Sequence, residues 1–212
     1  MRITEIFHSI QGESTFAGRP CVFVRLTGCP LRCTWCDTDY AFYGGAEQSI
    51  DQIVETVRAY GCPLVEVTGG EPLAQSECLV LLTRLCDEGF MVLLETSGAI
   101  DTTTVDARVH VILDVKCPGS GMTDRMHWAN ITRLKQHDEA KFVIQDRADF
   151  DYAIDVIRRH DLTARVAAVL LSPVHGVLAP ATLTEWLLES GVDARLQLQA
   201  HKYIWSPETR GV

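Results

Sequence analysis

The sequence predicts an α/β fold whose mostly parallel strands form a partial, open (β/α)6-type barrel. Short apolar runs rich in β-branched residues alternate along the chain with segments whose apolar residues recur at helical spacing. This alternation indicates a parallel sheet with right-handed crossovers. The chain holds about six such units, too few for a closed eightfold barrel of typically about 250 residues. We therefore expect a single domain over residues 1–212.

The strands are predicted from composition and alternation. Residues 3–9 alternate loosely and end in a Gln-Gly-Glu turn, residues 21–26 form the first buried strand, and residues 166–171 are almost continuously apolar. The full set of expected strands is 3–9, 21–26, 64–67, 91–94, 111–115, 141–144 and 166–171.

Four helices are predicted from apolar residues at helical spacing. The first begins at a capping box of Ser49 and Gln52 and ends at Gly61, and the last is expected to be capped by Thr182 with Glu185. The apolar faces are, in chain order, Ile50, Ile53, Val54 and Val57; Leu79, Leu82 and Cys86; Phe150, Ala153, Ile154 and Ile157; and Leu183, Trp186 and Leu187.

The composition favours a protein that binds a small molecule. The 19 Lys and Arg residues and 28 Asp and Glu residues give a net charge of −9, and no Lys/Arg-rich run occurs, so a nucleic-acid partner is not expected. No N-terminal targeting pattern is present, and the apolar runs are too short to span a bilayer. We therefore expect a soluble, cytosolic protein whose thiols are reduced.

Three cysteines, Cys29, Cys33 and Cys36, lie within eight residues. A 4Fe-4S cube needs four ligands, so a cube held by these three thiolates would leave one iron open for chemistry. A zinc site with His8 or a distant histidine as its fourth ligand is one alternative, and three inert buried thiols are another. The Gly28-Cys29-Pro30 turn argues against the inert reading, because such a run is typical of a loop.

The other five cysteines are expected to hold no metal. Cys78 and Cys86 fall on a helix face, Cys21 begins a strand, and Cys62 follows the end of a helix. The role of Cys117, in one of the turns considered next, stays open.

Glycine or polar residues follow several of the predicted strands. The carboxyl ends of parallel strands lie along one edge and bind ligands there, so these turns should converge on one rim. They are residues 29–38, 68–72, 95–98 and 116–119.

Arg25 lies in a strand that is otherwise apolar. Strand alternation puts Arg25 on the face opposite Val24 and Leu26. Because a buried guanidinium needs a carboxylate partner, Arg25 is expected to bind either a protein carboxylate, Glu66 or Glu95, or the carboxylate of a substrate.

These motifs together carry a resemblance. The C-x3-C-x2-C spacing with an aromatic residue, Trp35, before the third cysteine resembles the radical S-adenosylmethionine (SAM) superfamily. The wider set resembles the 7-carboxy-7-deazaguanine synthase family of queuosine biosynthesis, a tRNA modification pathway. The motifs are Ile10-Gln-Gly-Glu13, Phe23-Val-Arg-Leu-Thr-Gly-Cys29, Cys36-Asp-Thr38, Thr68-Gly-Gly-Glu-Pro72 and Glu95-Thr-Ser-Gly98.

The resemblance implies a cofactor set and a site. Cys29, Cys33 and Cys36 would hold a 4Fe-4S cluster, and Thr38 would bind Mg²⁺. The residues implied to contact SAM are Trp35, Cys36, Asp37, Gly69, Gly70, Glu71, Gly98 and Lys116. The residues implied to contact the substrate are Ile10, Gln11, Gly12, Glu13, Arg25, Thr96 and His201. The Asp-Val-Lys-Cys-Pro sequence around Lys116 departs from the Ser-Pro-Lys-Pro pattern of many members, so a solvated lysine is the alternative there.

The resemblance also implies the reaction. A radical generated from SAM would take a hydrogen atom from C6 of 6-carboxy-5,6,7,8-tetrahydropterin, the ring would contract, and ammonia would leave to give 7-carboxy-7-deazaguanine with SAM regenerated. An electron donor such as a flavodoxin and a homodimer are expected. An activase of the same superfamily, acting on a protein partner, is the rival function. A non-catalytic iron–sulfur carrier is a weaker rival, because it would need a fourth thiolate.

Overall fold

A computed structural model describes residues 1–212 and shows one nine-stranded sheet in the order β3-β1-β2-β4-β5-β6-β7-β8-β9. Strands β2 and β4 to β9 run parallel, and β1 and β3 add an antiparallel edge. The strands are β1 Arg2–Ile10, β2 Pro20–Leu26, β3 Ala46–Glu47, β4 Leu64–Gly69, β5 Met91–Thr96, β6 His110–Val115, β7 Glu139–Ile144, β8 Ala168–Pro173 and β9 Arg195–Leu196. The open, mostly parallel α/β fold is thus confirmed.

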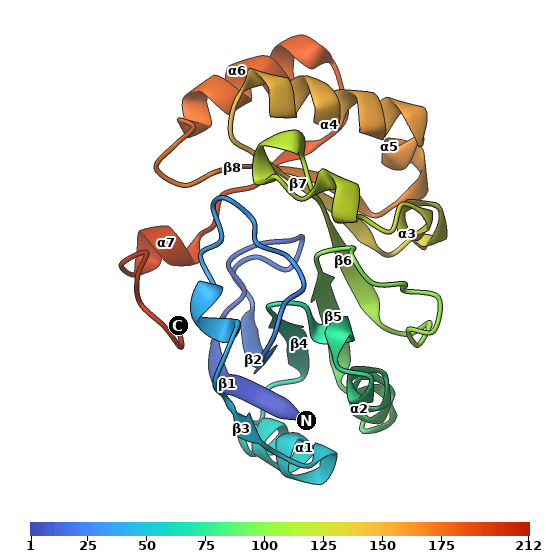
Figure 1. Ribbon diagram of the computed structural model, residues 1–212, viewed down its shortest axis with the longest axis vertical. Helices are drawn as coiled ribbons and strands as arrows, with labels where there is room; N and C mark the ends of the chain where they lie inside the picture. Colours follow the sequence, from blue (N-terminus) through green and yellow to red (C-terminus); the bar gives the residue numbers. More distant parts are fainter.

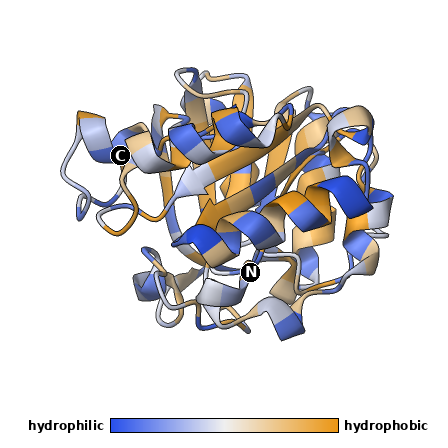
Figure 2. Ribbon diagram, turned by 90° about the horizontal axis from the view of Figure 1, so that it is seen from above, coloured by the Kyte–Doolittle hydropathy of each residue, from blue (hydrophilic) through white to orange (hydrophobic).

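Helices pack around the outer side of this curved sheet (Figure 1). They are α1 Ile50–Ala59, α2 Glu77–Asp87, α3 Ala129–Arg133, α4 Arg147–Arg159, α5 Leu162–Arg165, α6 Pro180–Ser190 and α7 His201–Ile204. Short 3-10 turns are η1 Asp39–Ala41, η2 Pro72–Ala74, η3 Pro118–Ser120 and η4 Thr123–Arg125. Figure 2 shows hydrophobic residues gathered on the strands and the facing sides of the helices. No helix is long and apolar enough to cross a bilayer.

The four predicted helices are present, with two corrections. Helix α1 has the expected capping box, with Ser49 accepting a hydrogen bond from the backbone N–H of Gln52. Helix α6 begins before the predicted cap, because Pro180 occupies its first turn and Ala179 is the N-cap residue. Proline is favoured at the first helical position, where no intrahelical N–H is needed. Thr182 therefore lies inside the helix.

The buried face of α2 is also turned from the predicted one. Its fully buried residues are Cys78, Leu81, Leu82 and Leu85. Leu79 and Cys86 are only half-buried at the margin of this face. The helical period of 3.6 residues per turn fits the predicted face and the observed face equally well. The rotation of α2 about its axis is therefore set by its packing against the sheet.

Charged residues interrupt the apolar strands on the inner side of the sheet. Arg25, Glu66, Glu95, Asp114 and Lys141 come from β2, β4, β5, β6 and β7. Strand alternation sends their neighbours into the apolar core under the helices, while these five line a cavity. The barrel therefore has an apolar outer layer and a charged interior.

Candidate active site

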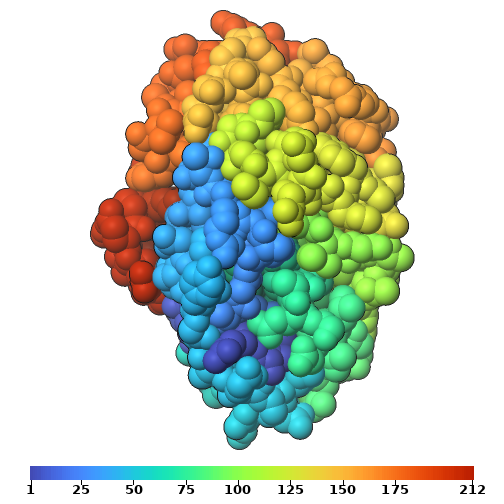
Figure 3. Space-filling model, in the orientation of Figure 1, coloured from blue at the N-terminus to red at the C-terminus, as the bar shows by residue number.

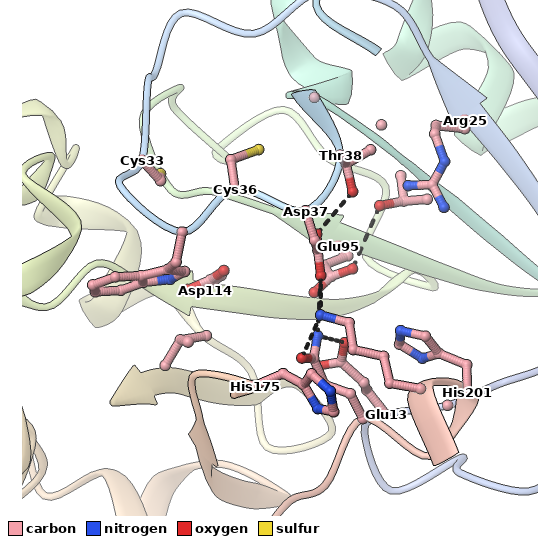
Figure 4. Close-up of a pocket in the computed structure, with 18 of the residues that line it drawn as sticks. Glu13, Arg25, Cys33, Cys36, Asp37, Thr38, Glu95, Asp114, His175 and His201 are labelled. Carbon is pink, nitrogen blue, oxygen red and sulfur yellow. Dashed lines mark hydrogen bonds and ion pairs between the residues drawn. The ribbon is translucent and has the colours of Figure 1, made fainter. Parts of the chain in front are cut away.

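A cavity of about 780 Å³ opens at the carboxyl ends of the parallel strands. All but two of the predicted site residues line it: Ile10, Gln11, Gly12, Glu13, Arg25, Cys29, Cys33, Trp35, Cys36, Asp37, Thr38, Gly69, Gly70, Thr96, Lys116 and His201. Figure 4 shows Cys33 and Cys36 on one side of the cavity, and Arg25, Glu13 and His201 on the other. The three cysteine thiols and a polar pocket therefore share one cavity.

Cys29, Cys33 and Cys36 are the only cysteines that line the cavity. Each is free and partly exposed, and burial raises the pKa of each thiol. A bound metal centre would offset that shift, because coordination deprotonates a thiol. Three free thiols on one loop, facing a cavity, therefore fit an iron–sulfur cluster.

The zinc alternative fits less well. No three Cys, His, Asp or Glu side chains in the chain gather closely enough to hold one metal ion. All ligands of a single zinc ion must lie about 2.0–2.3 Å from it and therefore close to one another. The thiolates of a 4Fe-4S cube bind different irons, so their sulfur atoms can lie farther apart. His8 packs against Tyr60, with ring centroids 5.7 Å apart, and does not line the cavity.

The remaining thiols lie away from the cavity. Cys21, Cys62, Cys78 and Cys117 are buried, and Cys86 is half-buried on α2. Burial raises the pKa of Cys117 well above its usual value, which keeps the thiol protonated and unreactive. Cys117, which follows β6, therefore serves as a buried residue of the apolar core.

The Gly69-Gly70 turn is fixed by close packing against the cysteine loop. A Cβ atom on Gly70 would lie 2.7 Å from Cβ of Cys29 and would also overlap the Gly28 carbonyl. A Cβ atom on Gly69 would overlap the Leu26 carbonyl. The two glycines therefore let the turn after β4 lie directly beside the first cluster cysteine.

Lys116 lines the cavity with its side chain only 12% exposed and paired with a carboxylate, which argues against a fully solvated lysine. Its Nζ atom lies 2.7 Å from Oδ2 of Asp114. Burial opposes its charge, but Asp114 and then Cys33 raise its pKa above the usual value. Lys116 therefore brings a positive charge to the Cys33 side of the cavity, where it faces any anionic ligand.

Arg25 pairs with Glu5 of β1 rather than with Glu66 or Glu95. Its Nε atom donates to Oε1 of Glu5 at 2.8 Å, and the hydroxyl of Tyr40 donates to the same oxygen at 2.8 Å. Burial raises the pKa of Tyr40 to about 12, so its hydroxyl stays a donor. The guanidinium makes no hydrogen bond through its Nη atoms, which leaves those groups for a ligand carboxylate.

The loop after β1 meets the start of α7 across the cavity. A Cβ atom on Gly12 would overlap the ring of His201, and the Ala200 N–H donates to the Gly12 carbonyl at 2.9 Å. Burial lowers the pKa of His201, so the ring is neutral at pH 7 and can donate one hydrogen bond and accept one. Only glycine allows this close approach.

Relatives in sequence settle the family. A 46% identical protein from Koribacter versatilis covers 100% of this chain and 100% of its own length, and a 46% identical protein from Chlorobaculum tepidum covers 100% and 97%. Both are named 7-carboxy-7-deazaguanine synthase. The chain belongs to the 7-carboxy-7-deazaguanine synthase family.

The broader matches agree with this family. A family model described as the Radical SAM superfamily matches residues 23–118. The crystal structure of QueE from Escherichia coli superposes with a TM-score of 0.76 at 24% identity, covering 94% of each chain, which supports the fold. The resemblance to the 7-carboxy-7-deazaguanine synthase family is therefore confirmed, and the activase alternative is not favoured.

Two residues predicted from the family pattern lie outside the cavity lining. Glu71 is fully buried, and its carboxylate accepts hydrogen bonds from the Ser97 N–H at 2.7 Å, the Thr96 hydroxyl at 2.9 Å and the Leu73 N–H at 3.0 Å. Its side chain therefore orders the turn after β5 and does not line the cavity. Gly98 packs against Met126 and is likewise not part of the lining.

Thr38, the predicted Mg²⁺ ligand of the 7-carboxy-7-deazaguanine synthase pattern, is half-buried at the cavity. Its hydroxyl donates to Oδ1 of Asp37 at 3.0 Å. Oδ2 of Asp37 in turn lies 2.5 Å from Nζ of Lys202. Thr38 and Asp37 thus place two oxygen-bearing groups at the cavity, and a magnesium ion bound there would need further ligands from water or substrate.

Sequence reasoning missed several charged residues of the cavity. Lys141 of β7 lies 2.5 Å from Oε2 of Glu13 and 2.8 Å from Oε1 of Glu95. Asp114 keeps one buried oxygen, Oδ1, without a partner. Each interrupts a run of apolar residues in its strand, and that interruption is the signal that could have identified them.

The C-terminal segment also contributes to the site. Residues 207–212 line the cavity, and the guanidinium of Arg210 lies 4.1 Å from the ring centroid of Tyr40. Figure 3 shows this segment, coloured red, as a cap on one side of the molecule. No motif in the sequence marked it.

Proposed function

We propose that this chain converts 6-carboxy-5,6,7,8-tetrahydropterin to 7-carboxy-7-deazaguanine with loss of ammonia, a step in queuosine biosynthesis. The observation that carries the proposal is one cavity that joins three free thiols to a polar pocket containing Arg25 and His201. Relatives that share 46% of its residues over the whole chain are named for this activity. The enzyme is a carbon–nitrogen lyase.

The cysteine loop would hold the cofactors. Cys29, Cys33 and Cys36 are the proposed ligands of a 4Fe-4S cluster, which with bound SAM and an electron from a reductant would supply the radical that takes a hydrogen atom from C6. The proposed SAM contacts are Trp35, Cys36, Asp37, Gly69, Gly70 and Lys116. The glycine turn after β4 leaves its backbone open to the methionine end of SAM, since no Cβ atom covers it.

The opposite wall would hold the pterin. The free Nη atoms of Arg25 would bind the substrate carboxylate, since a guanidinium can match a carboxylate with two parallel hydrogen bonds. The polar ring edges would contact Gln11, Gly12, Glu13, Thr96 and His201, with Ile10 beside them. The sheet and residues 207–212 of the C-terminal segment would border the bound pterin on two sides.

A magnesium ion is also part of the proposed site. Mg²⁺ would bind Thr38 together with the substrate carboxylate, because this ion is often held by one or two anionic groups plus waters. We propose further that residues 1–212 form a single domain and that the protein is a homodimer. A flavodoxin-like protein would be its electron donor, and its location would be the cytoplasm.

The test is anaerobic reconstitution followed by mass analysis of the products. The reconstituted protein, given SAM, a reductant and the carboxypterin, should yield 7-carboxy-7-deazaguanine and ammonia. A protein that cleaves SAM but leaves the carboxypterin unchanged would contradict the proposal and favour an activase.

A further inference from the structure

The cysteine loop, residues 29–38, packs on the β6 turn, residues 117–122, which includes η3. The hydroxyl of Thr34 donates to the Gly119 carbonyl at 2.6 Å, and the Thr34 N–H donates to the Ser120 carbonyl at 3.2 Å. Figure 3 shows the two segments in contact, with the cysteine loop in blue and the β6 turn in yellow-green. Thr34 therefore joins the loop to the turn through both its side chain and its backbone.

A second contact holds the loop on the other side of Cys33. The Arg32 N–H donates to Sδ of Met122, in the β6 turn, at 3.3 Å. The β6 turn has its own internal support, because the hydroxyl of Ser120 donates to the Cys117 carbonyl at 2.6 Å. The contacts between loop and turn use no thiol. They therefore fix the backbone on both sides of Cys33 and do not occupy its sulfur.

The β6 turn is in turn held by a buried carboxylate from another element. Asp149 lies in the first turn of α4 and is 1% exposed. Its Oδ1 atom accepts a hydrogen bond from the Gly119 N–H at 2.7 Å, and its Oδ2 atom accepts one from the Gln145 N–H at 3.1 Å. The N-cap residue of α4, Asp146, accepts a hydrogen bond from the Asp149 N–H at 3.0 Å. The carboxylate therefore ties the β6 turn to the start of α4 and to the residue after β7.

Close packing at Gly119 joins these groups. A Cβ atom on Gly119 would lie 2.6 Å from Oδ2 of Asp149 and 3.1 Å from Cζ3 of Trp35. The backbone of the β6 turn is therefore in close contact with both the carboxylate and the cysteine loop. A buried carboxylate is costly unless donors satisfy it, and here the donors are backbone N–H groups. Asp149 does not line the cavity, so contact with a ligand does not account for it.

We propose that Asp149 is a positioning residue for the iron–sulfur cluster: it holds the β6 turn, and the turn holds the cysteine loop through Thr34. This inference rests on the proposed function, because it takes the loop cysteines as cluster ligands. The cysteine loop contains no helix or strand of its own. Groups behind the metal ligands commonly fix the orientation of those ligands, and a hydrogen-bonded path from α4 supplies such a support here.

The experiment compares Asp149→Asn and Thr34→Val with a matched control, Thr56→Val, in the anaerobically reconstituted protein. An amide has one oxygen, so Asn can accept only one of the two backbone hydrogen bonds. Val keeps the shape of Thr34 and removes its hydroxyl. The control loses the same kind of bond, because the exposed Thr56 hydroxyl donates to the Gln52 carbonyl at 2.8 Å within α1, outside the cavity lining.

The first readout is the rate at which an iron chelator removes the cluster, followed by the visible iron–sulfur absorbance. Thr34→Val should lose the cluster about fivefold faster than wild type, the factor by which one lost hydrogen bond shifts the opening of the loop. Asp149→Asn should lose it at least about tenfold faster, because hydrogen bonds to a charged acceptor are stronger. Thr56→Val should match wild type.

The second readout is the electron paramagnetic resonance signal of the reduced cluster. It should broaden in Asp149→Asn and Thr34→Val, because the ligands are held less uniformly. A residue that serves only the stability of the fold would leave the signal of an assembled cluster unchanged. An unchanged signal in both variants would therefore contradict a positioning role.

A readout without metal separates this inference from the proposed function. Hydrogen exchange in the peptide 29–38 of the metal-free protein should be faster in Asp149→Asn and Thr34→Val than in wild type, and unchanged in Thr56→Val. If wild type assembled no cluster, the proposed function would be overturned. Hydrogen exchange would still decide whether Asp149 holds the cysteine loop.

Wild-type rates of cluster loss and of loop exchange in Asp149→Asn would overturn the inference, and so would equal effects in Thr56→Val. The double variant of Asp149→Asn and Thr34→Val should lose the cluster more slowly than the product of the two single effects, because both changes break one path. If Asp149→Asn does not fold, Thr34→Val carries the test, since Thr34 is exposed. Wild-type rates in Thr34→Val would then overturn the inference.

Discussion

At the scale of single residues, the cavity separates thiols that can bind a cluster from those that cannot. Replacing Cys36 with Ala should abolish the visible iron–sulfur absorbance and the iron content, because the cube would lose one of only three protein ligands. Cys86→Ala is the matched control, since Cys86 is half-buried on α2 outside the cavity lining. It should keep full iron. A Cys36→Ala protein that retained four irons and full turnover would refute the ligand assignment.

Arg25 tests how the substrate carboxylate is recognised. Arg25→Ala should weaken carboxypterin binding by about 2 to 5 kcal/mol, the range for losing one partner of a buried charged pair. SAM affinity should change little. Arg25→Lys should rescue only part of the loss, because an ammonium group cannot form two parallel hydrogen bonds. If SAM and the pterin weakened equally in a calorimetric titration, Arg25 would serve the fold through Glu5 instead.

Thr38 tests the magnesium assignment. Turnover and pterin affinity of wild type should rise with added Mg²⁺, and Thr38→Ala should blunt both responses while the cluster absorbance stays unchanged. The reason is that a hydroxyl and a substrate carboxylate together meet the oxygen preference of this ion. Undiminished turnover and pterin affinity after treatment with a chelator would remove the role of Thr38 in metal binding.

At the scale of elements, the turn after β4 and the cysteine loop form one packed unit. Gly70→Ala should displace the loop, because the new Cβ atom would overlap the Gly28 carbonyl and Cβ of Cys29. We expect a lower iron content and weaker SAM binding, with the circular dichroism of the α/β fold retained. Normal iron content and SAM affinity in this variant would show that the two loops do not depend on each other.

The elements also show what the sequence can and cannot predict. The strands and α1 were predicted well, because strand alternation and a capping box are local patterns. The direction of the Glu71 side chain was not, because no local pattern shows that it turns toward Thr96 and Ser97. Arg25 likewise pairs with Glu5 through the antiparallel register of β1 and β2, which no local pattern specifies.

At the scale of the whole molecule, the open barrel is completed by the end of the chain. After β9 the backbone returns to the loop after β1, where Ala200 donates to Gly12. Residues 207–212 then lie over the cavity beside Tyr40. The two outermost strands, β3 and β9, are each two residues long, which leaves little free edge for unwanted strand pairing. The C-terminal segment therefore borders the cavity on a side that the open sheet leaves uncovered.

The central claim is that one cavity holds SAM and the carboxypterin close enough for a hydrogen atom to pass between them. The most direct measurement follows deuterium from carboxypterin labelled at C6 during anaerobic turnover. We predict that SAM recovered after turnover carries deuterium at its 5′ carbon while 7-carboxy-7-deazaguanine accumulates. Product formation with no deuterium in SAM or in 5′-deoxyadenosine would contradict the account.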